Sequence, residues 1–176
     1  MKKIITPRLL FVVAMVFVAA FSRLITHIPN MTPVFAIALF GGTYIKRKSL
    51  AFLIPLAALL ISDAFIGFYT QMYAIYISFA ITVAIGFYLR RKINAVSVVG
   101  ASLASSIVFF ILSNFAVWIS GVGILTYPLN IHGFMFCYFQ AIPFFGYELI
   151  GTLLYTTVIF GIFNIVVNRV RVLAKI

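Results

Sequence analysis

Long apolar segments alternate with short polar breaks along this chain. An α-helix rises 1.5 Å per residue, so about 20 apolar residues cross a hydrocarbon core about 30 Å thick. Most of the segments have about that length, and proline, glycine or basic residues separate them. The pattern predicts six helices, over residues 7–25, 33–45, 49–66, 72–89, 95–118 and 144–167.

The composition places these helices in a membrane. Of the 176 residues, 65% are hydrophobic and only 9% are charged, and the mean hydropathy is +1.22. A soluble domain of this size could not bury so much apolar surface. The length leaves room for six short-looped helices and no separate soluble domain. We therefore expect an all-α fold, a polytopic membrane protein with six transmembrane helices in a single domain over residues 1–176.

The net charge of +11 has two readings, a nucleic-acid partner or a membrane orientation. No nucleic-acid-binding module is recognisable, and the basic residues form short clusters between apolar segments, as the positive-inside rule describes. We therefore expect no nucleic-acid partner, a lipid bilayer around the chain, and both termini in the cytoplasm. Arg23 is alone on the outer side, and twelve of the thirteen basic residues share the inner side: Lys2, Lys3, Arg8, Lys46, Arg47, Lys48, Arg90, Arg91, Lys92, Arg169, Arg171 and Lys175.

The segment over residues 23–33 is the most polar stretch between two apolar segments. Thr32 followed by Pro33 is typical of an N-cap and a proline at the first helical position. The helix predicted from there ends before Lys46 and spans about 20 Å, which is too short to cross a membrane. Either the helix stops short, or residues 27–32 lie below the membrane surface. Irregular backbone at that depth requires protein or a watery cavity beside it, so we expect this loop to form a wall of a binding site.

The other polar residues gather on the same outer side. Asp63 and Glu148 are the chain's two acids, and a buried carboxylate is costly in lipid, so each should face a partner inside the bundle. Arg23 is the obvious partner for one of them. Two readings stay open, a structural ion-pair cluster and a ligand site. The candidate ligand-binding residues are Arg23, His27, Asn30, Asp63, Asn114, Trp118, Tyr138 and Glu148.

Sequence motifs for catalysis are missing. The chain has no H-E-x-x-H, no G-x-S-x-G and no phosphate-binding loop, and its two histidines and one cysteine show no metal-ligand spacing. We expect no enzymatic activity, no cofactor and no metal. With Cys137 alone, an intramolecular disulfide is impossible.

The pattern R-x3-H-x-P-N-x-T-P-x2-A-x-A-L-F-G-G over residues 23–42 resembles the opening of a group of uncharacterised bacterial six-helix membrane proteins. Later pieces that match include Ser62-Asp63, Ser113-Asn114-Phe115, Tyr127-Pro128 and residues 141–145. That group is similar in turn to the substrate-binding S components of energy-coupling factor (ECF) vitamin transporters. The resemblance implies an S-component-like bundle in the bacterial inner membrane. It also implies a vitamin-like substrate in the outer half, with an ECF coupling protein and an ATPase module as partners, although some such proteins work alone.

The leading hypothesis is therefore a substrate-binding membrane protein for uptake of a small organic nutrient. The alternative is a membrane interaction or assembly protein whose outer polar cluster holds the bundle together. A third class is a membrane enzyme that uses Asp63, Glu148 or a histidine. A cavity open to the outside distinguishes the first from the second, and an acid and a base within about 3 Å of each other would favour the third.

Overall fold

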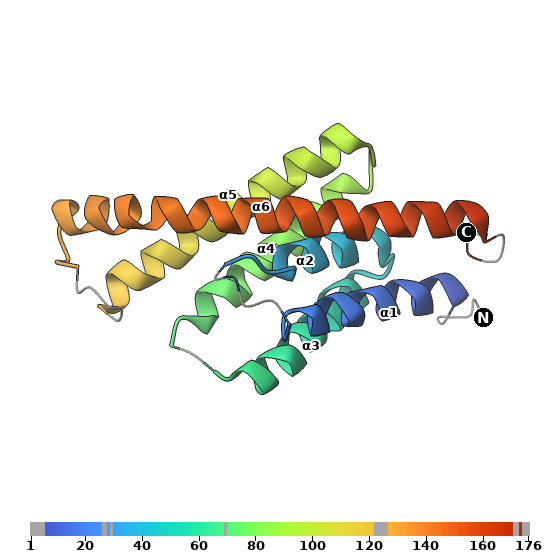
Figure 1. Ribbon diagram of the computed structural model, residues 1–176, viewed down its shortest axis with the longest axis horizontal. Helices are drawn as coiled ribbons and strands as arrows, with labels where there is room; N and C mark the ends of the chain where they lie inside the picture. Colours follow the sequence, from blue (N-terminus) through green and yellow to red (C-terminus); the bar gives the residue numbers. More distant parts are fainter. Residues whose placement is uncertain are drawn as a thin grey trace.

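The computed structural model describes residues 6–25, 28, 30–68, 70–121, 127–170 and 173. Within these residues the chain forms six helices and no strands, which confirms the all-α prediction (Figure 1). The helices are α1 Pro7–Ser22, α2 Val34–Tyr44, α3 Lys48–Ile66, α4 Met72–Leu89, α5 Ala95–Ser120 and α6 Ile131–Arg169.

The start of α2 differs by one residue from the prediction. Pro33, rather than Thr32, is the N-cap, and no side chain caps the helix. The reason is the backbone of Pro33, whose ψ of 6° lies outside the helical range while its carbonyl already accepts from the Ile37 N–H at 2.9 Å. By contrast, α1 has the expected threonine cap: Thr6 Oγ1 accepts from the Leu9 N–H at 3.1 Å, and Pro7 follows.

The sixth helix is much longer than predicted. The interval over residues 119–143 was expected to be a connection, but α6 begins at Ile131 and continues through Pro143. Asn130 starts the helix, because its Oδ1 accepts from the Gly133 N–H at 2.9 Å. Gly133 marks close packing, since a Cβ there would overlap the Pro128 carbonyl oxygen. A proline inside a membrane helix costs one backbone hydrogen bond and is tolerated there, so Pro143 does not end α6.

Helix α2 is the centre of the bundle. Its residues from Val34 to Thr43 are all buried, and each of the other five helices contacts it. Its closest approach is to α4: a Cβ on Gly42 would overlap the Val83 carbonyl oxygen, and a Cβ on Gly86 would overlap Leu39 and Gly42. Small residues at such a crossing allow two backbones to come together in lipid. Gly42 and Gly86 therefore let α2 and α4 pack closely at this crossing.

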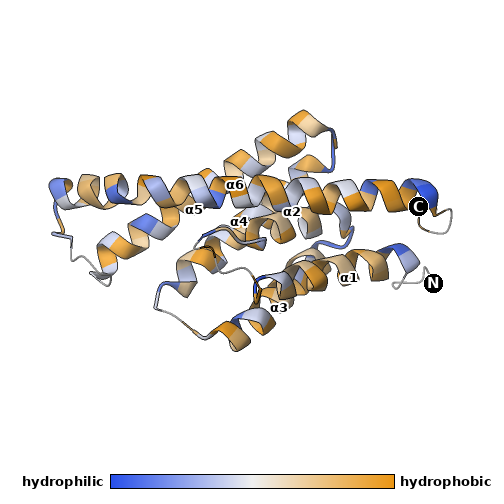
Figure 2. Ribbon diagram, viewed as in Figure 1, coloured by the Kyte–Doolittle hydropathy of each residue, from blue (hydrophilic) through white to orange (hydrophobic). Residues whose placement is uncertain are grey.

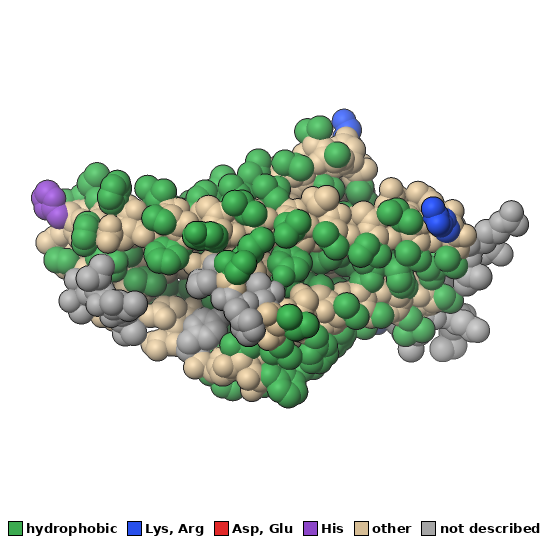
Figure 3. Space-filling model, in the orientation of Figure 1, with side chains coloured by type: hydrophobic (Ala, Val, Ile, Leu, Met, Phe, Trp, Pro, Cys, Tyr) green, Lys and Arg blue, Asp and Glu red, His purple; other side chains and the backbone are tan. Residues whose placement is uncertain are grey.

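Four helices, α3 to α6, are long and apolar enough to cross a membrane. The other two are shorter apolar helices, α1 with 16 residues and α2 with 11. At 1.5 Å per residue α2 is about 17 Å long, short of the hydrocarbon core, as the sequence predicts. Figure 2 shows hydrophobic residues along all the helices, and hydrophobic side chains cover most of the face in Figure 3. These features indicate a membrane protein.

The basic connections share one end of the molecule. Helix α1 begins there and α6 ends there, and the α2–α3 and α4–α5 connections lie toward the same end (Figure 1). The C-terminal ends of α3 and α5 and the N-terminal ends of α4 and α6 lie toward the other end. This is the arrangement that the charge pattern predicts for Arg8, Arg169 and the basic clusters over residues 46–48 and 90–92. Lys2, Lys3, Arg171 and Lys175 lie outside the described residues.

Arg90 has a structural role beyond its charge. Its guanidinium donates to three carbonyl oxygens. Gly42, in the last turn of α2, accepts at 2.7 Å, and Ile45 and Lys46, which follow the helix, accept at 2.5 Å and 3.1 Å. Carbonyls at a helix C-terminus have no partner within the helix, and a cation there is also favoured by the helix dipole. Arg90 thus fixes the C-terminal end of α2, and the N-terminal end of α2 adjoins the site described next.

Candidate functional site

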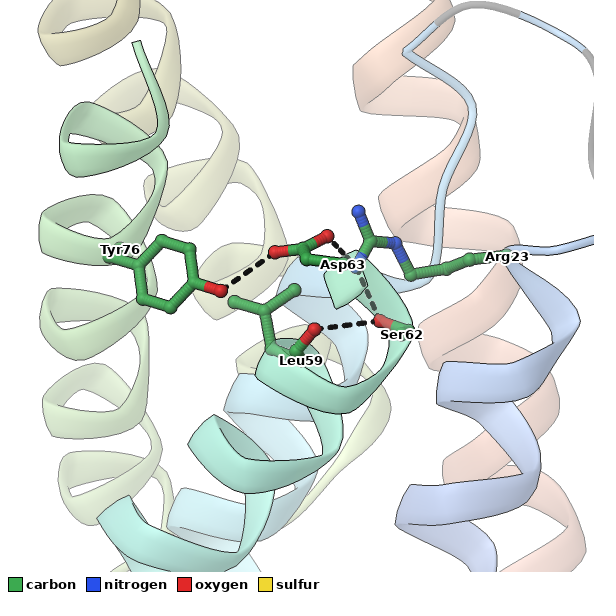
Figure 4. Close-up of polar contacts among 5 residues, drawn as sticks. All are labelled: Arg23, Leu59, Ser62, Asp63 and Tyr76. Carbon is green, nitrogen blue, oxygen red and sulfur yellow. Dashed lines mark hydrogen bonds and ion pairs between the residues drawn. The ribbon is translucent and has the colours of Figure 1, made fainter. Parts of the chain in front are cut away.

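Arg23 and Asp63 form a buried ion pair at the C-terminal ends of α1 and α3. Arg23 Nη1 lies 2.7 Å from Asp63 Oδ1, and the two side chains are 8% and 0% exposed. Arg23 directly follows α1 as its C-cap, and Asp63 lies in the last turn of α3. The pairing confirms the expectation that Arg23 is the partner of one of the two acids (Figure 4).

Two hydroxyl groups complete this cluster. Tyr76, from α4, donates to Asp63 Oδ2 at 2.8 Å, and Arg23 Nη1 donates to Ser62 Oγ at 2.6 Å. Ser62 in turn donates to the Leu59 carbonyl at 2.8 Å. Both carboxylate oxygens of Asp63 therefore face a cation or a donor (Figure 4). A buried pair offsets its desolvation cost only with such extra hydrogen bonds, so this cluster can hold α1, α3 and α4 together.

Glu148 has a different environment. It lies within α6 and is 3% exposed. Its Oε1 accepts from Thr152 at 2.8 Å, one turn along the same helix, and from Ser106 of α5 at 3.3 Å. Oε2 is buried and receives no hydrogen bond from the part of the chain that the structure describes. Oε1 is thus held in place by two hydrogen bonds, whereas Oε2 has no hydrogen-bond partner among the described residues.

Two adjoining cavities surround Glu148 and the loop before α2. Their volumes are about 230 and 210 Å³, and Asn30, Phe109 and Glu148 line both. The first cavity is bounded on its other sides by Arg23, Thr32, Val34, Phe35 and Ile75. The second extends between α5 and α6 and is lined by Phe110, Ser113, Asn114, Val117, Ala141, Phe144 and Phe145.

The loop before α2 packs deep against the bundle. Gly151 lies near the middle of α6, and a Cβ there would press on Cα of Met31. Asn30 has a φ of +61°, a left-handed conformation that asparagine adopts more readily than most residues. Its backbone also accepts from the Thr32 N–H at 3.1 Å. Residues 30–32 therefore form irregular backbone beside protein and a cavity, which is what the sequence predicts for this segment.

The structure divides the predicted site residues into separate groups. Asp63 lies behind Arg23 and lines neither cavity. Trp118 and Tyr138 are also absent from the cavity walls: Trp118 Nε1 donates to the Pro128 carbonyl at 3.0 Å, and the Tyr138 hydroxyl to the Ile111 carbonyl at 2.7 Å. His27 lies outside the described residues. The cavities bring together Arg23, Asn30, Asn114 and Glu148.

Several residues at the cavities were not among the predicted ones. Thr152 follows Glu148 by four residues, a spacing that puts the two side chains on the same helix face. Their contact could therefore have been predicted from the sequence. Ser106 lies on α5, 42 residues from Glu148 in the sequence, so no local spacing links the two. Phe35 and Phe109, whose ring centroids lie 4.8 Å apart, had no distinguishing signal among the chain's twenty phenylalanines.

The groups that line the cavities can bind a small molecule. A guanidinium, a carboxyl group and two amides line these two cavities together with aromatic side chains. Such pockets, apolar with a few convergent polar groups, are typical of small-molecule sites. Across the described ranges, no three side chains of His, Cys, Asp or Glu gather in a way that could hold a metal ion.

Comparison with protein families gives one match. Residues 3–173 match a group described as a family of unknown function, DUF6580. The chain belongs to this family. Because the match runs over nearly the whole chain, membership in DUF6580 applies to the bundle and both cavities together. Searches of curated proteins and of solved structures gave no match.

Proposed function

We propose that this protein binds a small organic nutrient in the outer half of the membrane and serves its uptake. The observation that carries this proposal is the pair of adjoining cavities lined by Arg23, Asn30, Asn114 and Glu148. The loop between α1 and α2 lies at the ends of these helices opposite to the basic α2–α3 connection. In the orientation that the basic clusters favour, the cavities therefore belong to the side facing away from the cytoplasm.

The dimensions of the cavities limit the ligand. Pockets for drug-sized molecules have about 300–1,000 Å³. Each cavity here is smaller, about 230 and 210 Å³, and the two share three wall residues. A compact molecule of vitamin or vitamin-precursor size fits one of them, or extends across both.

The resemblance to ECF S components supports the same function. In that architecture the membrane protein binds the substrate, and an ATPase module with a coupling membrane protein supplies the energy. No nucleotide-binding motif occurs in this sequence, so active transport by it would need such partners. Our proposal accordingly includes a bacterial inner-membrane location with cytoplasmic termini, and binding rather than catalysis.

A thermal-shift screen of the purified protein in detergent tests the proposal. A compound that binds only the folded state must raise the melting temperature. We expect at least one vitamin or precursor to do so, and the shift to be much smaller in Asn30→Gly, which removes a side chain from both cavities. Trp118→Phe is the matched control, because Trp118 lines neither cavity and should keep the full shift.

A second function keeps support from one observation. Both carboxylate oxygens of Asp63 have partners within the protein, Arg23 and Tyr76, as they would in a purely structural cluster. This favours the interaction or assembly protein, in which the polar residues only hold the bundle together. If no compound raises the melting temperature, or if Asn30→Gly keeps every shift, the assembly function replaces the binding function.

A further inference from the structure

The open oxygen of Glu148 sets the chemistry of what can bind beside it. Oε2 is buried and accepts no hydrogen bond from the residues that the structure describes, although the side chain lines both cavities. A buried carboxyl oxygen without a partner is costly in an apolar bundle. Oε1 of the same group already accepts from two hydroxyls, Thr152 and Ser106, so Oε2 is the oxygen that remains to be paired.

The charges lining the cavities do not balance. Arg23 is the cation on the cavity wall among the described residues, and it is engaged with Asp63 at 2.7 Å. In the same part of the chain, no Lys, Arg or His forms a salt bridge with Glu148. The Arg23–Asp63 pair is neutral as a unit, so among the described residues Glu148 is the acid at the cavities that has no countercharge.

The apolar walls favour the same kind of ligand. Phe35 and Phe109 form a tilted ring pair with centroids 4.8 Å apart, and both line the cavity that Glu148 and Arg23 share. An aromatic face attracts a cation, most strongly where water is excluded. A carboxylate beside two aromatic rings is therefore suited to a positively charged group with an apolar body.

We infer that the ligand carries a protonated nitrogen that donates to Glu148 Oε2, with its uncharged part lying against Phe109. This inference rests on the proposed binding function and adds the chemical class of the ligand. The class is a small organic cation, such as a primary amine, an amidine or a protonated ring nitrogen. Arg23 Nε, which is buried without a hydrogen-bond partner among the described residues, is placed to meet an acceptor on the same molecule.

Three probes of similar shape and different charge test the inference on the wild-type protein. Benzylamine, benzyl alcohol and benzoate are titrated separately by calorimetry at pH 7, with empty detergent micelles subtracted. We expect benzylamine to bind at least about tenfold more tightly than the other two, a difference of about 1.4 kcal/mol. Glu148→Gln, which keeps the shape and removes the charge, should abolish that preference. Trp118→Phe, outside both cavities, should keep it.

The outcomes separate this inference from the proposed function. Binding of all three probes with equal affinity, or a preference for benzylamine that survives in Glu148→Gln, overturns the cation inference while leaving a binding cavity. The absence of binding by any probe counts against the binding function itself and the inference with it. Stabilisation by sodium ions alone, lost in Glu148→Gln, would assign Oε2 to an inorganic cation and also overturn the inference. Because the probe series uses the wild-type protein, it remains decisive even where the variant fails to fold.

Discussion

Asp63 and Glu148 are the two acids of the chain, and both are buried in the bundle, but their surroundings differ. Asp63 has a cation on one oxygen and a tyrosine hydroxyl on the other. Glu148 has two hydroxyls on one oxygen and, from the described residues, no hydrogen bond to the other, while its side chain lines both cavities. Both oxygens of Asp63 are thus paired, whereas Oε2 of Glu148 has no partner in the part of the chain that the structure describes. A buried acid is therefore not by itself a sign of function, and its unused hydrogen-bonding capacity is the better guide.

The largest effect on stability should come from removing the charge of Asp63, the acid whose two oxygens are both paired. Asp63→Asn removes the partner of Arg23 and leaves a buried guanidinium uncompensated, which should lower the free energy of unfolding by about 3–5 kcal/mol. Denaturant unfolding in detergent, followed by circular dichroism, measures this. The control is the double variant Arg23→Leu with Asp63→Leu, which removes both charges and should recover much of the loss. A wild-type stability for Asp63→Asn would contradict the structural role of the pair.

The hydroxyl on Asp63 should contribute less than the ion pair. Tyr76→Phe removes the 2.8 Å hydrogen bond to Oδ2 and keeps the ring. A hydrogen bond to a charged group contributes about 1.5–3 kcal/mol, so we expect a loss of stability in that range. The same unfolding measurement applies. Tyr73→Phe is the matched control, because Tyr73 is exposed on the same helix, and a loss as large there would contradict the specific role of Tyr76.

Ligand affinity should depend on the loop beside Glu148. Asn30→Gly should weaken binding of a compound identified by the thermal-shift screen by about 1–3 kcal/mol, because a polar group on the ligand loses its partner. Glycine is chosen because φ is +61°, which strains alanine but not glycine. The stability of the free protein should change little. If the affinity is unchanged, or if only the stability falls, the loop is structural.

The free protein should tolerate the loss of the open acid. Glu148→Gln keeps the size of the side chain and removes a buried charge without a countercharge among the described residues, so its stability should equal or exceed that of the wild type by up to about 1 kcal/mol. Asp63→Asn and Glu148→Gln both replace a carboxyl group by an amide. Their opposite expected effects on stability therefore test the difference between the two acids most directly. A destabilisation of Glu148→Gln as large as that of Asp63→Asn would show that both acids are structural.

The orientation of the protein in the membrane decides to which side the Glu148 cavities open. Testing it needs no change in stability. Cys137 is buried and is first replaced by serine; Lys48 and His132, both exposed, are then replaced by cysteine one at a time. We expect an impermeant thiol reagent to label position 132 in intact cells and position 48 only after the membrane is opened. Labelling of position 48 from outside would reverse the orientation.

Sequence alone determined the parts of this protein that depend on local pattern and charge. Apolar segments of membrane-spanning length predict the helices, because the bilayer requires each backbone group to bond within its own segment. The shortness of α2 was predicted in the same way, because its apolar segment lies between Pro33 and Lys46, which are only 13 residues apart. The pairing of Arg23 with an acid followed from the cost of a lone charge in lipid.

The tertiary structure decided the parts that depend on which faces meet. Pro143 and Gly133 look like loop residues in the sequence, yet packing and the Asn130 cap carry α6 through them. Trp118 and Tyr138 seemed equivalent to Asn114, but only Asn114 reaches a cavity. Ser106 meets Glu148 from 42 residues away, a distance that no local spacing encodes. Which acid is completed and which is left open depends on how α5, α6 and the loop before α2 pack together, and that packing is a property of the folded bundle.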